Sequence, residues 1–117
     1  MKNQVQLIGN VGQAPEIKVL DNGRKMAKFS LATHESYRAA SGEKIQQTQW
    51  HRLVAWGRTA EFIENYVSRG RHIAIQGKLN NRSYTGADGQ TRYVTEVVVD
   101  EVLLLDSRKE EVKTAQN

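Results

Sequence analysis

The chain has 117 residues, of which 38% are hydrophobic and 26% charged, with no cysteine and a net charge of +4. This length fits one domain, and the absence of cysteine excludes disulfides and thiolate-based metal sites or nucleophiles. No apolar run approaches the roughly 20 residues that cross a bilayer, and the N-terminus lacks the apolar core of a signal peptide, so we expect a cytoplasmic protein with no membrane partner.

The positive charge is concentrated ahead of residue 106. From Asp106 onward three acidic residues balance three basic ones, so the whole excess lies between residues 1 and 105. Excess positive charge on a folded domain favours a polyanionic partner such as nucleic acid over an acidic small molecule. Residues 106–117 are polar, and we expect them to form a short flexible tail.

The first half of the chain is predicted to form three strands. Alternating apolar residues indicate a first strand over residues 5–20, bent near its glycines, followed by a hairpin turn at 21–23. Residues 27–33 alternate again and predict the second strand. Residues 34–44 are polar and are expected to form a loop before the third strand, 48–57.

The second half is predicted to begin with the only good helix candidate, residues 59–69. Thr59 is a suitable N-cap residue, and a glycine follows the segment. Residues 72–79 alternate and predict a fourth strand, with Leu79 among its inward residues. Residues 80–92 are polar and indicate a projecting hairpin, and the apolar segment 94–105 predicts the last strand.

This order of elements predicts an all-β domain. Five short strands with a helix between strands 3 and 4 are typical of the OB-fold, a five-stranded Greek-key barrel. An SH3-like barrel does not normally place a full helix there. We therefore predict an OB-fold domain over residues 1–105, whose oligonucleotide-binding face uses the second and third strands and the loops after strands one and four.

The segment TQWHRLVAWG, residues 48–57, contains both tryptophans of the chain. On a strand, Trp50, Arg52 and Trp56 share one face, and His51 points to the other. A flat π surface beside a guanidinium is suited to hold an unpaired nucleobase and its phosphate. The same pattern is also typical of two indoles packed in the core of a small barrel.

The other aromatic residues divide into two groups. Tyr37 and Tyr84 lie in polar segments where no core is available, which favours a stacking role together with the two tryptophans. Tyr66 and Tyr93, in contrast, lie on apolar stripes and are expected to be packed. The best candidates for phosphate contacts are Arg52, between the two tryptophans, and Arg58, directly after the segment.

The sequence offers little for catalysis. The three histidines lie in separate elements, without the spacing of a metal site. Neither a nucleophile elbow nor a phosphate-binding loop is present, and the scattered carboxylates do not form a two-metal nuclease set. We expect no enzymatic activity, no metal and no cofactor.

These residues together resemble a known family. The chain is similar to the bacterial-type single-stranded DNA-binding proteins from about residue 3 to residue 105. The matching stretches are VQLIGNVGQAPE (5–16), FSLATHESYR (29–38), TQWHRLVAWG (48–57), AEFIENYVSRG (60–70) and TEVVVDEVLLL (95–105).

The resemblance implies a homotetramer with single-stranded DNA wrapped around it, acting in replication, recombination and repair in the bacterial nucleoid. The family's stacking positions match Tyr37, Trp50, Trp56 and Tyr84. Its basic positions along the DNA path look similar to Arg52, Arg58, Arg69 and Arg82. His51 matches a position associated with subunit contacts.

The resemblance is incomplete at the C-terminus. Family members usually end in an acidic tip that recruits replication and repair enzymes, whereas this sequence reads RKEEVKTAQN. Three alternative functions remain open at this point: a protein-interaction module of a replication-restart assembly, an RNA-binding OB-fold and a metal-dependent nuclease.

Overall fold

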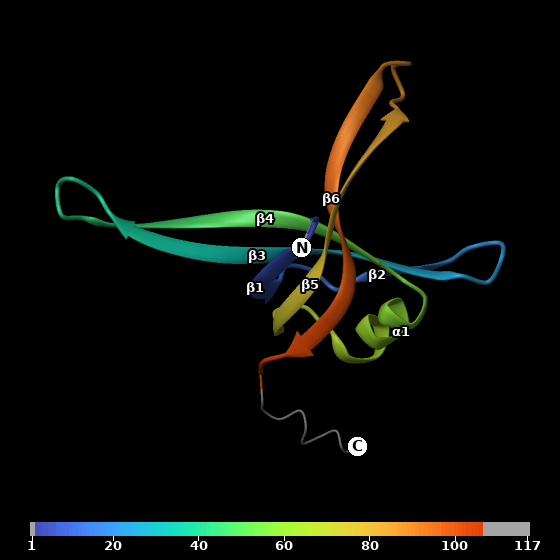
Figure 1. Cartoon of the computed structure of the whole chain (residues 1–117), viewed down its shortest axis with the longest axis horizontal. Helices are drawn as coiled ribbons and strands as arrows, with labels where there is room; N and C mark the ends of the chain where they lie inside the picture. The colour runs from blue at the N-terminus through green and yellow to red at the C-terminus, as the bar shows by residue number, and fades with distance from the viewer. Residues whose placement is uncertain (1, 107–117) are drawn as a thin grey trace.

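The computed structural model describes residues 2–106, which form six strands and one helix (Figure 1). In chain order the elements are β1 (Val5–Val11), β2 (Glu16–Val19), β3 (Lys25–Arg38), β4 (Lys44–Trp56), α1 (Gly57–Tyr66), β5 (His72–Thr85) and β6 (Thr91–Leu104).

The six strands form one sheet that closes into a barrel. Their order is β1-β5-β6-β4-β3-β2, and β1 also pairs with β3, which joins the two sides of the sheet. β4 and β6 are parallel, and the other pairs are antiparallel. The predicted first strand is divided into β1 and β2. Counted as one bent strand, they complete the predicted five-stranded OB-fold, with α1 between its third and fourth strands.

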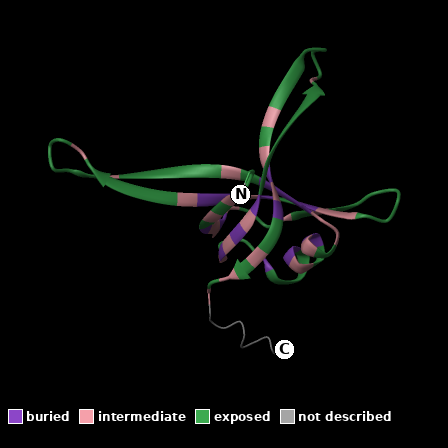
Figure 2. Cartoon of the chain, viewed as in Figure 1, coloured by how far each residue is buried: buried purple, intermediate pink, exposed green. Residues whose placement is uncertain are grey.

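The core is small and lies where the strands cross. Figure 2 shows the buried positions gathered at this crossing and on the inner side of α1. Leu31, Ile63 and Ile73 are the largest fully buried side chains there, and no polar or charged residue is buried among those described. α1 contributes Ala60 and Ile63 to this core, so its apolar face packs against the barrel.

Closure of the barrel depends on two glycines at which backbones meet. A Cβ atom on Gly77 would overlap the carbonyl oxygen of Val98, and one on Gly9 would overlap that of Ala32. The β5–β6 register also shifts between Gln76 and Gly77. A residue without a side chain is therefore required where β5 bends across β6.

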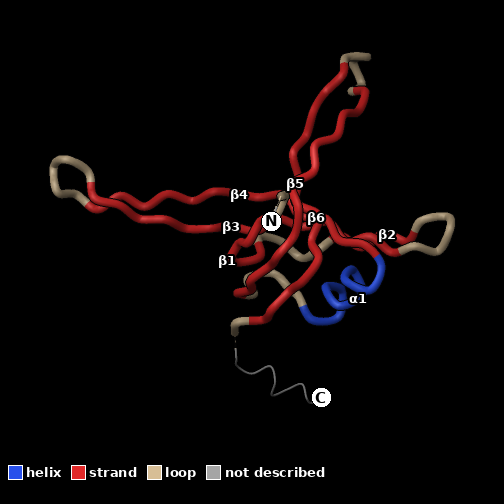
Figure 3. The backbone as a smooth tube through the Cα atoms, in the orientation of Figure 1, coloured by secondary structure: helices blue, strands red, loops and turns tan. Residues whose placement is uncertain are grey.

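Two long arms leave the barrel, one formed by β3 and β4 over residues 34–49 and the other by β5 and β6 over residues 78–96. Figure 3 shows them as paired strands that diverge from the barrel. The predicted loop at 34–44 and much of the predicted hairpin at 80–92 are therefore strand, because Tyr37 pairs with Ile45 and Tyr84 with Arg92. Where an arm extends beyond the barrel, both of its faces are exposed to water. Apolar and polar residues therefore do not alternate in that part of the sequence.

The predicted helix is displaced toward the N-terminus. α1 begins at Gly57, whose φ of 61° turns the chain out of β4, and Val67 after the helix is already extended. Thr59 therefore lies inside the helix rather than at its cap, and Arg69 lies beyond it. Within the described residues no helix has the length and apolar character needed to cross a membrane.

Three apolar side chains predicted to be packed are exposed. Tyr93 is 80% exposed, and Leu79 is half exposed. Both residues lie on the β5–β6 arm, beyond the point where the strands leave the core. Tyr66 is also half exposed, although its ring lies 4.9 Å from that of Phe62.

The predicted tail begins at a residue that still contacts the barrel. The backbone N–H of His72 donates to both carboxylate oxygens of Asp106, at 3.1 and 3.2 Å. Arg71 also forms an ion pair with Asp106 at 3.5 Å. The rest of the predicted tail, 107–117, lies outside the described residues.

We predict that Gly77→Ala destabilises the barrel by about 3 kcal/mol, because the new methyl group meets a backbone oxygen that cannot move without breaking the sheet. Gly42→Ala is the control: Gly42 has φ of 89° and open space around it, so only about 1 kcal/mol of conformational strain is expected. Urea unfolding followed by circular dichroism measures both losses. Equal losses would show that the close approach at Gly77 is unimportant.

Candidate nucleic-acid interface

Trp50 presents its indole to solvent. It is 62% exposed on β4, where its backbone is paired with Ala32 of β3. The inner side of the ring lies against Gly12, where an added Cβ would be 2.5 Å from Cζ3 of the indole. Core packing is therefore excluded for Trp50. Gly12 provides the space that lets the indole lie close to the barrel wall with its other side open.

A shallow groove of about 340 Å³ lies between the barrel wall at β3 and β4 and the base of the β5–β6 arm. Arg52, two residues along β4 on the same strand face, lines it, as do Lys28 and Arg82. Glu96 also lines the groove and forms an ion pair with Arg82 at 3.2 Å. Glu16 is a second carboxylate in the lining, so the three basic side chains of the groove exceed its acidic ones by one.

Trp56, at the end of β4, is in a different environment. It is half buried, and the guanidinium carbon of Arg24 lies 4.5 Å from the centroid of its ring. Arg24 follows the turn between β2 and β3, and β3 pairs with β4 so that Met26 faces Trp56. Sequence reasoning did not identify Arg24 as a site residue.

Tyr37 and Tyr84 lie on the two arms rather than beside Trp50. Both tyrosines are about half exposed. Tyr37 is on the opposite strand face from Ala32, the partner of Trp50, because the β3–β4 register is continuous. The guanidinium carbon of Arg82 lies 6.0 Å from the ring centroid of Tyr84. The four predicted stacking residues therefore form a dispersed set, and one subunit does not gather them into one patch.

The arginines separate into those that bind other protein groups and those that do not. Arg38 donates to the carbonyl of Gly42, and Arg92 forms an ion pair with Asp88 at 2.6 Å. Within residues 2–106, the exposed arginines without an ion pair or a side-chain hydrogen bond are Arg24, Arg52, Arg58 and Arg69.

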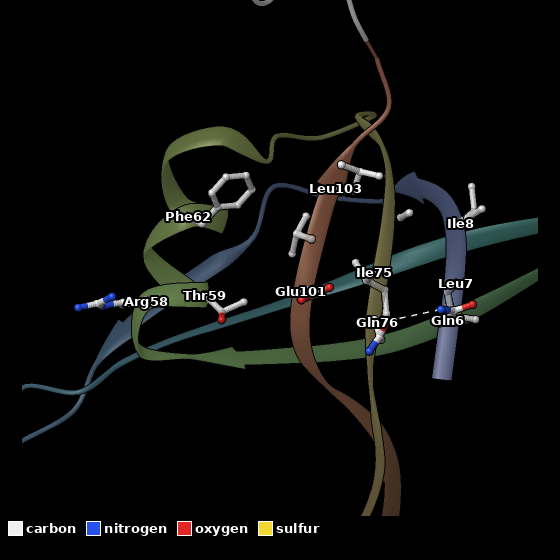
Figure 4. A pocket seen from close by; sticks show the side chains of 12 residues that line it. Gln6, Leu7, Ile8, Arg58, Thr59, Phe62, Ile75, Gln76, Glu101 and Leu103 are labelled. Carbon is white, nitrogen blue, oxygen red and sulfur yellow. Dashed lines mark hydrogen bonds between the residues drawn. The ribbon is translucent and has the colours of Figure 1, made fainter. Parts of the chain in front are cut away.

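The free arginines are not all in the groove. Arg58 is in the first turn of α1 and extends away from the sheet in Figure 4. Arg69 is exposed in the turn after α1. Three of the four predicted phosphate-binding arginines thus keep their donors available, while Arg82 shares its donors with Glu96.

His51 is half buried at the point where the β3–β4 arm leaves the barrel. Its Nε2 atom lies 2.9 Å from the hydroxyl oxygen of Thr33. On the other strand face, Nδ1 of His34 lies 3.1 Å from the hydroxyl oxygen of Thr48. Within the described part of the chain, no three His, Asp or Glu side chains are grouped so that they could hold a metal ion.

One ion pair attaches the β2–β3 turn to the helix. Nζ of Lys25 lies 2.6 Å from Oε1 of Glu64. This hydrogen bond, together with the charges of Glu64 and Glu61, raises the pKa of Lys25 above its ordinary value. A raised lysine pKa means that the attraction is fully present at neutral pH and is lost only as the pH rises through that pKa.

Comparisons with known proteins agree with this geometry. Residues 2–105 match the model of the single-strand binding protein family. A "Single-stranded DNA-binding protein" of Bacteroides thetaiotaomicron is 43% identical over 108 residues, covering 91% of this chain and 67% of the relative.

A solved structure, "Plasmodium falciparum SSB complex with ssDNA", superimposes with a TM-score of 0.83 and 35% identity, covering 89% of this chain and 95% of the other. The match in sequence spans the whole barrel and both arms, and the match in structure extends over nearly the same length. The chain belongs to the single-strand binding protein family.

Proposed function

We propose that this chain binds single-stranded DNA with little sequence preference and without catalysis, and protects it during replication, recombination and repair. The observation that carries the proposal is the exposed indole of Trp50, which lies on Gly12 next to the groove that Arg52 lines. The names of the Bacteroides relative and of the Plasmodium complex support the same ligand.

Stacking on Trp50 accounts for both affinity and sequence tolerance. Base–aromatic stacking contributes about 1–3 kcal/mol per base, and every base has a π face. Arg52 is exposed and has no protein partner for its donors within residues 2–106, so it is available to a phosphate. Tyr37 and Tyr84 extend the same chemistry outward along the arms.

Because the aromatic residues are dispersed, a bound strand must pass over several parts of the surface. Trp50 lies on the barrel, while Tyr37 and Tyr84 lie on arms that diverge from it (Figure 1). This arrangement supports wrapping of DNA around an assembly of several copies. The corresponding location of the protein is the cytoplasm, in association with the nucleoid.

The outer face of β1, β5 and β6 supports self-association into the homotetramer. Ile8, Ala74 and Leu103 lie in register across these strands, and Ile8 and Leu103 are 59% and 63% exposed. They line a mostly apolar cavity of about 590 Å³ beside α1, with Phe62 on its helix side and Arg58 and Glu101 among its polar lining residues (Figure 4). A second copy of the chain would remove this row from water.

His51 remains a proposed subunit contact. It lies near the base of the β3–β4 arm and is only half buried, with Nε2 against the hydroxyl of Thr33.

Titration with oligo-dT tests the proposed ligand. We expect strong quenching of tryptophan fluorescence at low salt, because a base stacks on Trp50. Affinity should fall steeply with salt, since each phosphate neutralised on a single strand adds about 0.7 to the slope of log K against log[salt]. RNA of equal length serves as competitor. Absence of binding at low salt would exclude the proposal, and preferential binding of RNA would reassign the ligand.

Substitution of Trp50 separates stacking from folding. We predict that Trp50→Ala weakens oligo-dT binding by about 1–3 kcal/mol per stacked base and changes the melting temperature little, because the ring is exposed. Trp50→Phe should retain most of the affinity. Anisotropy of a labelled oligonucleotide and thermal unfolding measure the two effects. A large loss of stability with unchanged affinity would return Trp50 to a structural role.

Charged substitutions on the apolar row test the assembly. We predict that wild-type chains have a mass near four times 13.2 kDa by light scattering. Ile8→Glu and Leu103→Glu should give smaller species, because a carboxylate cannot be buried unpaired in an interface. Val19→Glu, an equally exposed aliphatic position on β2, is the control and should remain assembled. A monomeric wild type would contradict the wrapped arrangement.

A further inference from the structure

His34 lies at the base of the β3–β4 arm, on the same strand face as Trp50. The continuous register pairs His34 with Thr48, and two residues along it pairs Ala32 with Trp50. His34 and Trp50 are therefore diagonal cross-strand neighbours, which lie about 7–8 Å apart and within reach of aromatic side chains. Both side chains are exposed. A DNA strand with a base stacked on Trp50 thus passes close to the imidazole.

One ring nitrogen of His34 is held by the protein, and the other is not. Nδ1 lies 3.1 Å from the hydroxyl oxygen of Thr48, the cross-strand partner of His34. Within residues 2–106 the Nε2 atom has no hydrogen-bond or ion-pair partner. In a protonated imidazole both nitrogens are donors. Nδ1–H then donates to the hydroxyl of Thr48, and Nε2–H is left for an acceptor outside the chain.

The strand face of β3 and β4 that carries His34 has basic side chains and no carboxylate. Its other charged residues are Lys28, Arg38, Lys44 and Arg52. Glu35, the next residue along β3, alternates to the opposite face. A protonated His34 therefore finds no counter-ion on its own strand face.

The neighbouring elements were searched for carboxylates in the same way. Residues 12–15, which begin against the indole of Trp50, contain no charged side chain. The two acidic side chains of the groove each have a basic neighbour, namely Lys28 for Glu16 and Arg82 for Glu96. A backbone phosphate of a bound strand is therefore the counter-ion that suits the ring of His34.

We propose that His34 is a phosphate-binding residue on the path of single-stranded DNA and that it binds in its protonated form. Histidine is the side chain whose charge changes between about pH 5 and 8. A phosphate beside the ring favours the charged form, because an opposite charge within about 4–6 Å stabilises it. Binding of DNA therefore takes up a proton, and affinity rises as the pH falls. The proposal rests on the proposed DNA-binding function and adds His34 to it.

The pH dependence of affinity tests the protonated contact. Anisotropy of an oligo-dT with a label that does not titrate is measured over a range of salt at about pH 5.5 and about pH 8, on either side of the imidazole titration. At the lower pH we expect wild-type affinity to be about two- to fivefold higher. The slope of log K against log[salt] should be steeper by up to about 0.7. His34→Gln should lose most of both differences, because an amide takes up no proton.

Calorimetry measures the proton itself. Titration with oligo-dT at about pH 7, in two buffers with different ionisation enthalpies, gives the number of protons taken up on binding. The wild type should take up more than His34→Gln and as many as His72→Gln. His72→Gln is the matched control, because His72 begins β5 at the end of that strand opposite the arm, where its backbone contacts Asp106.

A permanent charge at position 34 should replace the proton. His34→Arg keeps a planar cation at every pH, so we expect tight binding with little difference between the two pH values. Thr48→Val removes the hydroxyl that positions Nδ1 and should reduce the pH dependence, whereas Thr48→Ser should keep it. Circular dichroism and light scattering at both pH values check that fold and assembly are unchanged. If His34→Gln is not folded, His34→Arg decides.

The outcomes separate this inference from the function on which it rests. Absence of oligo-dT binding by the wild type at low salt would overturn both. Normal binding with equal affinity at the two pH values, or with the same pH dependence in wild type and His34→Gln, would overturn the histidine contact alone. A fully pH-dependent His34→Arg would overturn it too, as would equal losses of proton uptake in His34→Gln and His72→Gln.

Discussion

Closure of the barrel through β1 is the constraint on which the rest of the structure depends. β1 pairs with β5 along its length and with β3 at Asn10 and Val11, so a short strand joins both sides of the sheet. The enclosed core is small, while β3, β5 and β6 each have 14 residues. Strands longer than the core they cover must extend beyond it, and the arms follow from this mismatch.

The arms and the barrel divide the binding chemistry between them. On the barrel, Trp50 and Arg52 take their positions from strand alternation and from the space at Gly12. On the arms, Tyr37 and Tyr84 are half exposed on paired strands, and the guanidinium of Arg82 lies beside the ring of Tyr84. A ligand that is itself flexible and repetitive fits such a surface, because it can contact rigid and projecting parts in succession.

The elements that could be predicted from the sequence are the strands with one buried face, because burial of one face makes apolar and polar residues alternate. Ala27, Phe29 and Leu31 alternate because one side of β3 faces the core, and the barrel order and the exposed tryptophan strand followed from such patterns and from the family resemblance. The strand character of the arms was missed, because no burial pattern marks a ribbon that is wet on both faces. The position of Arg24 over Trp56 was also beyond the sequence, since it depends on the turn after β2 and on the β3–β4 register together.

Asp106 fixes the point at which the chain leaves the barrel after β6. Its carboxylate is held by the backbone of His72 and by Arg71, and the next residue back, Leu105, donates to the carbonyl of His72. This anchor is at the opposite end of β6 from the arm that starts at Thr91. A tether or immobilising tag placed after it therefore leaves from the base of the barrel, and the groove and both arms remain accessible on a surface-bound molecule.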